Sequence, residues 1–99
     1  MNKLEQQVIV WAEERGIFLK SDPKSQMMKT VSEVGELADD INKGRDCRLE
    51  LGDVLVTLVL QAKMQNTTLA ECLDLAYNKI SQRKGEMVNG VFVREGDTV

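Results

Sequence analysis

The chain has 99 residues, a net charge of −3 and 42% hydrophobic residues, which fits one soluble globular domain over residues 1–99. It carries no basic run or aromatic platform, which argues against a nucleic-acid partner, and no apolar stretch reaches the roughly 20 residues that span a membrane. The two cysteines are too few for a disulfide framework, so we expect a cytoplasmic protein.

The apolar spacing of the N-terminal segment predicts a first helix from about Asn2 to Arg15, ended by Gly16. Residues 17–20 are expected to form a connector. The apolar stripe of this helix comprises Leu4, Val8, Trp11 and Ala12.

Clear end signals bound the second helix. Asp22 is a suitable N-cap, and Pro23 follows at the first helical position. Gly44 should end this helix, and a third helix should begin at about Cys47. The third helix is apolar almost all round from residue 49 to residue 64, so it should be buried.

The C-terminal third should hold one helix and one hairpin. Residues 68–71 read as a capping box, and Gly85 should end the helix that follows. The Asn89-Gly90 pair between apolar residues predicts a β-hairpin, with fraying from about Glu95. The predicted fold class is all-α, a four-helix and mainly antiparallel bundle with a short C-terminal β-hairpin. The residues expected to point inward from the last helix are Leu69, Cys72, Leu73, Ala76 and Ile80, with Cys72 as core packing.

Two acidic couplets carry the chemical information. Glu33 and Glu36 are three residues apart, as are Glu50 and Asp53, so each pair shares one helical face. On the third helix the acidic stripe continues through Thr57 and Gln61 against an apolar background. Because buried carboxylates are costly unless they are paired or coordinate a cation, this stripe should face a wet, charged cavity.

The first couplet has the same layout. Glu33 should border the core, and Asp40 follows Glu36 on the same face. Each couplet has a glycine before its second acid, Gly35 or Gly52. A glycine within a helix costs roughly 1 kcal/mol relative to alanine, so the repeated cost suggests close approach of another helix or of a ligand.

A single E-x-x-E in an acid-rich chain usually means a solvated helix face, whereas two couplets on neighbouring helices favour a metal site. Carboxylate oxygens favour Mg²⁺, or Mn²⁺ as a substitute. The chain has no histidine, hence no Ser-His or Cys-His pair, and no phosphate-binding glycine loop. Carboxylates and a metal suit phosphoanhydride hydrolysis.

The pattern E-x-x-E, thirteen residues, then E-x-x-D resembles the MazG-like all-α nucleoside triphosphate pyrophosphohydrolases. The sequences of residues 29–38, 50–54 and 78–83 are also similar to that family, and the resemblance extends roughly over residues 4–94. It implies cleavage of a nucleoside triphosphate between the α and β phosphates, giving the monophosphate and pyrophosphate. It also implies a dimer or tetramer, in keeping with more apolar surface on the third helix than one small monomer covers.

The resemblance assigns roles to particular residues. Glu33 or Glu36 would orient or deprotonate the attacking water, and three residues, Asn78, Lys79 and Arg83, would contact phosphate. The implied Mg²⁺ ligands are Glu33, Glu36, Glu50 and Asp53.

Other interpretations remain open for several of these residues. Lys79 and Arg83 could form a solvated face, and Lys29 could bind substrate or simply pair with Glu33. Trp11 could stack on a nucleobase or pack in the core. The chain could also be a relative with a fixed metabolic substrate, such as phosphoribosyl-ATP, or a catalytically silent oligomeric binding or regulatory subunit. An intact set of four acids argues against a silent subunit.

Overall fold

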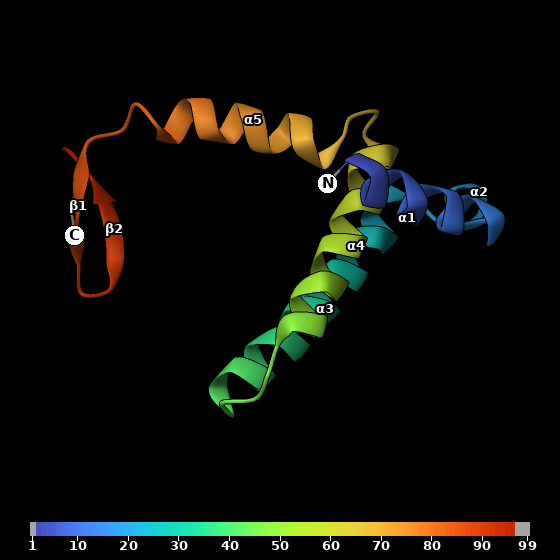
Figure 1. Ribbon diagram of the computed structural model, residues 1–99, viewed down its shortest axis with the longest axis horizontal. Helices are drawn as coiled ribbons and strands as arrows, with labels where there is room; N and C mark the ends of the chain where they lie inside the picture. The colour runs from blue at the N-terminus through green and yellow to red at the C-terminus, as the bar shows by residue number, and fades with distance from the viewer. Residues whose placement is uncertain (1, 97–99) are drawn as a thin grey trace.

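The computed structural model describes residues 2–96, which form five helices and one antiparallel β-hairpin (Figure 1). The predicted all-α class with a small C-terminal hairpin is confirmed. No helix in this described range is both long and apolar enough to cross a membrane. The elements in chain order are α1 (Asn2–Glu14), α2 (Ile17–Lys20), α3 (Pro23–Asn42), α4 (Arg48–Met64), α5 (Leu69–Ile80), β1 (Gly85–Val88) and β2 (Val91–Arg94).

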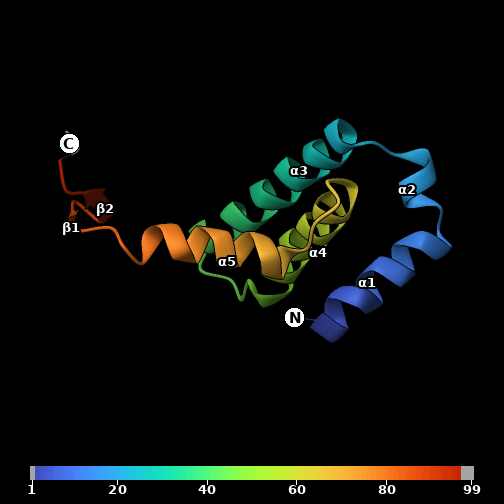
Figure 2. The same ribbon diagram turned by 90° about the horizontal axis from the view of Figure 1, so that it is seen from above.

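The centre of the fold is an antiparallel pair formed by α3 and α4, with α1 packed on α4 (Figures 1 and 2). Two side chains bond the start of α3 to the second half of α4. Gln26 Nε2 donates to the Thr57 carbonyl at 3.3 Å, and Gln61 Nε2 donates to the Pro23 carbonyl at 2.9 Å. The buried apolar core lies where α1 meets α4 and comprises Ile9, Ala12, Val59, Leu60 and Ala62.

Burial of α4 is confined to its second half. Thr57 is 4% exposed, whereas Leu51 and Leu55 are each 48% exposed, so the expectation of a fully buried helix was wrong. The reason is that α1 covers only the part of α4 nearest the core. The acidic stripe is likewise split, because Thr57 and Gln61 lie against α3 rather than in a wet cavity.

The predicted helix ends are largely confirmed. The Asp22 side chain accepts the Ser25 N–H at 2.8 Å, and the Thr68 hydroxyl accepts the Glu71 N–H at 3.1 Å. Gly44 follows α3 with φ 68°, a left-handed conformation that glycine adopts without steric cost.

Residues 17–20 are a one-turn helix, α2, and not the expected connector. Gly16 has φ 71°, which lets the chain turn after α1. The Gly16 carbonyl then accepts the N–H groups of Leu19 and Lys20 at 3.2 and 3.0 Å. These bonds close the turn.

Helix α5 departs most from expectation. It leaves the end of the α3–α4 pair and leads away from it (Figure 1). In the described chain none of its residues is buried, so the predicted inward packing of Leu69, Cys72, Leu73, Ala76 and Ile80 was wrong. Leu73 is 63% exposed, Ile80 is 51% exposed, and the Cys72 thiol is exposed too. The apolar face exists, but no helix within residues 2–96 covers it.

The helix also ends earlier than predicted, at Ile80. Ser81 is its C-cap, and the Arg83 N–H then donates to the Ile80 carbonyl at 3.0 Å in a turn. Gly85 instead begins β1. With α5 projecting, the radius of gyration is 16.3 Å, compared with about 13 Å for a compact chain of about 100 residues.

The C-terminal hairpin forms as predicted. Val88 pairs with Val91, and between them Asn89 and Gly90 have φ values of 50° and 82°. Two positive φ values are the mark of a type I′ turn. The Glu95 N–H donates to the Lys84 carbonyl at 2.6 Å, so the chain is still paired at Glu95. Residues 97–99 of the predicted frayed end lie outside the described residues.

Candidate functional site

Glu33 is held by a lysine on its own helix. Lys29 Nζ lies 3.1 Å from Glu33 Oε1, one helical turn away, and the Glu33 side chain is only 12% exposed. The hydrogen bond from Lys29 is the main cause that holds the pKa of Glu33 below its usual value. The pairing of Lys29 with Glu33, one of the two interpretations of Lys29, is therefore present in the structure, and it keeps Glu33 ionised.

Glu36 has the opposite electrostatic setting. Its hydrogen bond with Glu33 and the negative charge of Glu33 raise its pKa, and the charge of Asp53 on α4 raises it further. Like charges that share a site disfavour ionisation of both. Glu36 therefore feels the charge of Glu33 on its own helix and that of Asp53 on the next, so acids of the two couplets lie near each other across the α3–α4 pair.

Glu50, one turn before Asp53, carries an unsatisfied oxygen. Its Oε2 atom is buried and has no hydrogen-bond partner among the described residues. Such an oxygen is costly to bury unless a hydrogen bond or a cation compensates it. A divalent cation is a suitable partner, because hard cations take carboxylate oxygens as ligands.

The four acids do not form a closed ligand set. In residues 2–96 no group of three or more acidic or cysteine side chains lies close enough to hold an ion. In the structure the charges of Glu33 and Asp53 act on Glu36. Glu50 lies one turn before Asp53 on α4, and its Oε2 has no hydrogen-bond partner among the described residues. The donor set fits a hard cation, and its side chains would have to close around the ion.

The two helical glycines border open space. A Cβ atom on Gly35 or on Gly52 would meet nothing within 4 Å in the described chain. The expected close approach by another helix of this chain is therefore absent. The helix surface beside each couplet stays accessible to a ligand or to another molecule.

A mostly apolar groove runs between α1 and α4 and has Asp53 at its edge. Its volume is about 390 Å³. Trp11 lines it and is 44% exposed, so it does not pack in the core; the Arg15 guanidinium lies 4.6 Å from the centre of its ring. The lining residues are Leu4, Gln7, Val8, Trp11, Asp53 and Val56.

Sequence reasoning missed Gln7. It lies one turn before Trp11 on α1, so helical periodicity could have placed both side chains on one face. The position of that face beside Asp53 depends on how α1 packs on α4. Nothing in the local sequence indicates it.

A family comparison decides which kind of domain this is. The family model described as "MazG nucleotide pyrophosphohydrolase domain" matches residues 21–88, more than half of the chain. The chain belongs to this family. No curated protein and no solved structure matches it at a significant level.

Membership places both couplets, α5 and β1 inside the MazG domain. The domain is that of nucleotide hydrolases, and the family generally depends on a divalent metal. The donor set of the two couplets agrees with that dependence, since carboxylate oxygens suit Mg²⁺ and Mn²⁺.

The residues that resemble the phosphate-contacting segment of MazG proteins do not meet the acids within this chain. Asn78 and Lys79 are exposed near the end of α5, and Arg83 is half-buried just beyond it. Figure 1 shows this end of α5 well away from the α3–α4 pair. The structure therefore separates the cationic and acidic parts of the predicted site.

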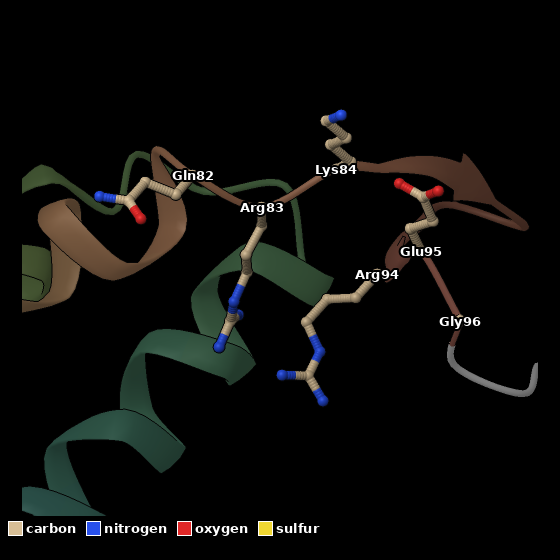
Figure 3. A pocket seen from close by; sticks show the side chains of 6 residues that line it. All are labelled: Gln82, Arg83, Lys84, Arg94, Glu95 and Gly96. Carbon is tan, nitrogen blue, oxygen red and sulfur yellow. The ribbon is translucent and has the colours of Figure 1, made fainter.

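Arg83 instead has a cationic neighbour that sequence reasoning missed, Arg94. Both line a hollow of about 650 Å³ between the end of α5 and the hairpin. Figure 3 shows the two side chains pointing the same way into it, while Lys84 points away. The hairpin register accounts for this, because Arg94 pairs with Gly85, two residues after Arg83.

Proposed function

We propose that this MazG domain hydrolyses nucleoside triphosphates between the α and β phosphates, releasing a nucleoside monophosphate and pyrophosphate. The observation that carries the proposal is the buried, unpartnered Oε2 of Glu50 on a helix whose acids face a second acidic couplet. In a protein that binds no metal, burial of an unpaired carboxylate oxygen would only cost free energy.

Mg²⁺, with Mn²⁺ as a substitute, is the proposed cofactor. Bound there, the ion would neutralise phosphate charge and lower the pKa of a coordinated water. Glu33 or Glu36 would orient or deprotonate the attacking water. Lys29 would stay paired with Glu33 and keep it ionised. The proposed ligands are Glu33, Glu36, Glu50 and Asp53.

The α1–α4 groove is the proposed seat of the nucleobase. Trp11 offers a flat, half-exposed ring for stacking. Asp53 lies both at the edge of this groove and near Glu36, so a base in the groove would place its phosphates next to the acids. Asn78, Lys79 and Arg83, which resemble the phosphate-contacting segment of the family, are the proposed phosphate contacts.

We further propose a homo-oligomer, a dimer or a tetramer, located in the cytoplasm. The uncovered apolar face of α5 and the exposed half of α4 support self-association, since exposed apolar patches commonly mark interfaces. Two free thiols, Cys47 and Cys72, are in keeping with a reducing compartment.

The test is a panel of ribo-, deoxy- and modified nucleoside triphosphates, with pyrophosphate as the detected product. Mg²⁺ or Mn²⁺ should support turnover and EDTA should abolish it. Glu50→Gln should lose turnover by orders of magnitude, whereas Glu14→Gln, on the exposed side of α1, should keep it. If no triphosphate releases pyrophosphate with either metal, the chain is a silent subunit and the proposal fails.

A further inference from the structure

Arg15, just beyond the end of α1, holds Trp11 by two contacts. Its Nη1 atom donates to the Trp11 carbonyl at 3.0 Å, and its guanidinium lies over the Trp11 ring, 4.6 Å from the ring centre. The Arg15 N–H bonds the Ala12 carbonyl at 3.2 Å. The Arg15 side chain therefore satisfies the Trp11 carbonyl at the end of the helix, where backbone partners run out, and it also covers one face of the indole.

The same ring lines the groove between α1 and α4. Asp53 lines that groove too, whereas Arg15 is not among its lining residues. A guanidinium over one face of a ring leaves the second face for a flat ligand, because aromatic groups stack through their faces. The arrangement has room for three layers, which are the guanidinium, the indole and a base in the groove.

The orientation of the indole depends on few other contacts. Trp11 is 44% exposed, and a half-exposed side chain keeps rotamer freedom that it loses when a ligand binds. The two contacts with Arg15 restrict this freedom before any ligand arrives, since one anchors the backbone of Trp11 and the other its ring. A ring that is already held in place binds a ligand more tightly, because less ordering remains to be done.

We propose that Arg15 is a positioning residue for the nucleobase site. It holds the Trp11 indole in the orientation that stacks on the base, and it contacts neither the base nor the phosphates. The inference rests on the proposed function, in which the α1–α4 groove binds the base, and it adds the residue that prepares the groove. The simpler alternative is that Arg15 only stabilises the end of α1, as basic side chains near a helix C-terminus commonly do.

Nucleoside binding tests the proposal without turnover. Trp11 is the single tryptophan of the chain, so tryptophan fluorescence reports on this ring alone. The parent and Arg15→Met are titrated with adenosine, guanosine, cytidine and thymidine in EDTA, which excludes binding through phosphate and metal. Methionine keeps a long, flexible side chain without the guanidinium. The concentration that gives half-maximal quenching should rise about two- to fivefold in Arg15→Met, as expected for loss of an exposed cation–π contact.

Lys24→Met is the matched control, because it removes an exposed cation of α3 that does not line the groove. It should be quenched as the parent is. The decay of fluorescence anisotropy without ligand gives a second readout, in which the indole should reorient faster in Arg15→Met than in the parent or the control. If Arg15→Met only melted at a lower temperature, with the quenching and the anisotropy of the parent, Arg15 would be a helix cap and the proposal would be wrong.

Triphosphate kinetics separate positioning from phosphate binding. With Mg²⁺, KM of Arg15→Met should rise by the same factor as the nucleoside concentration, and kcat should stay constant, because the base is bound equally in the substrate complex and in the transition state. A higher KM without any change in nucleoside quenching would show that Arg15 contacts phosphate, which contradicts the proposal.

Two outcomes distinguish this inference from the proposed function. A parent protein that releases pyrophosphate, but whose fluorescence no nucleoside quenches, keeps the hydrolase and overturns the role of Arg15. A parent protein that releases no pyrophosphate, but shows quenching that is weakened in Arg15→Met and not in Lys24→Met, supports the role of Arg15 and rejects the hydrolase.

Discussion

Glu5 on α1 accepts the backbone N–H of Leu69, the first residue of α5, at 2.8 Å, although 64 positions separate the two. Glu5 is 5% exposed. A carboxylate at a helix N-terminus satisfies an otherwise unpaired N–H and opposes the positive end of the helix dipole. Together with the Thr68 cap, this bond fixes the start of α5 and so the direction in which α5 leaves the core.

Removal of the Glu5 carboxylate should loosen that junction. Glu5→Ala leaves the part-buried Leu69 N–H without its partner, so the free energy of unfolding should fall by about 1–3 kcal/mol. Glu14→Ala, on the same helix but exposed, is the matched control and should change it by less than about 0.5 kcal/mol. Denaturant unfolding followed by circular dichroism measures both. Equal losses in the two variants would show that the Glu5 bond contributes nothing specific.

Two glycines give a second prediction, because alanine at Gly44 and alanine at Gly52 should change the free energy of unfolding in opposite directions. Gly44 has φ 68°, where an alanine costs about 1–2 kcal/mol, so Gly44→Ala should lower the free energy of unfolding. Gly52 lies within α4 with open space around it, so Gly52→Ala should raise it by about 1 kcal/mol through helix propensity. Thermal unfolding without nucleotide tests both. A loss of stability in Gly52→Ala would show that another molecule covers Gly52 in solution.

Local signals in the sequence were enough to predict most helix ends and the hairpin. Asp22, Thr68 and the Asn89-Gly90 pair each act on residues within four positions, so their effect does not depend on the rest of the fold. The pairing of Lys29 with Glu33 is of the same kind, one helical turn within α3.

The direction of α5 could not be predicted in this way. Its apolar face was correctly recognised, but periodicity shows only that a face needs a neighbour, not whether that neighbour belongs to the same chain. The bond between Glu5 and Leu69 and the meeting of Arg83 with Arg94 depend on tertiary placement. For the same reason the cationic and acidic halves of the site, adjacent in the sequence-based hypothesis, are apart in the structure.

The raised pKa of Glu36 gives a pH prediction. A folded-state pKa above the unfolded value means that the stability contribution of Glu36 is fully present below its ordinary pKa and is lost as pH rises through the raised value. The glutamine of Glu36→Gln does not ionise, so the variant does not lose this stability as pH rises. The melting temperature of Glu36→Gln minus that of the parent, without metal, should therefore grow as pH rises from about 4 to 7.

Glu33 supplies the control for that titration. Its pKa is lowered, chiefly by Lys29, so its contribution is present above its ordinary pKa and is lost as pH falls through the lowered value. Glu33→Gln should therefore melt below the parent at neutral pH, and the difference should shrink in acid. If both variants showed the same pH dependence, the two glutamates would not have the opposite electrostatic settings described above.

The last prediction separates a metal ligand from a structural carboxylate at Glu50. Its Oε2 is buried without a partner, and a neutral amide costs less to bury than a carboxylate. Without metal, Glu50→Gln should therefore melt at the same temperature as the parent or higher. With Mg²⁺ the parent should gain stability by mass action and the variant should gain less, while turnover falls by orders of magnitude. Asp53→Asn should behave in the same way. If these acids instead formed salt bridges, each variant would melt lower without metal, and its shift on adding Mg²⁺ would equal that of the parent. That result in both variants would remove the metal assignment and, with it, the hydrolytic function.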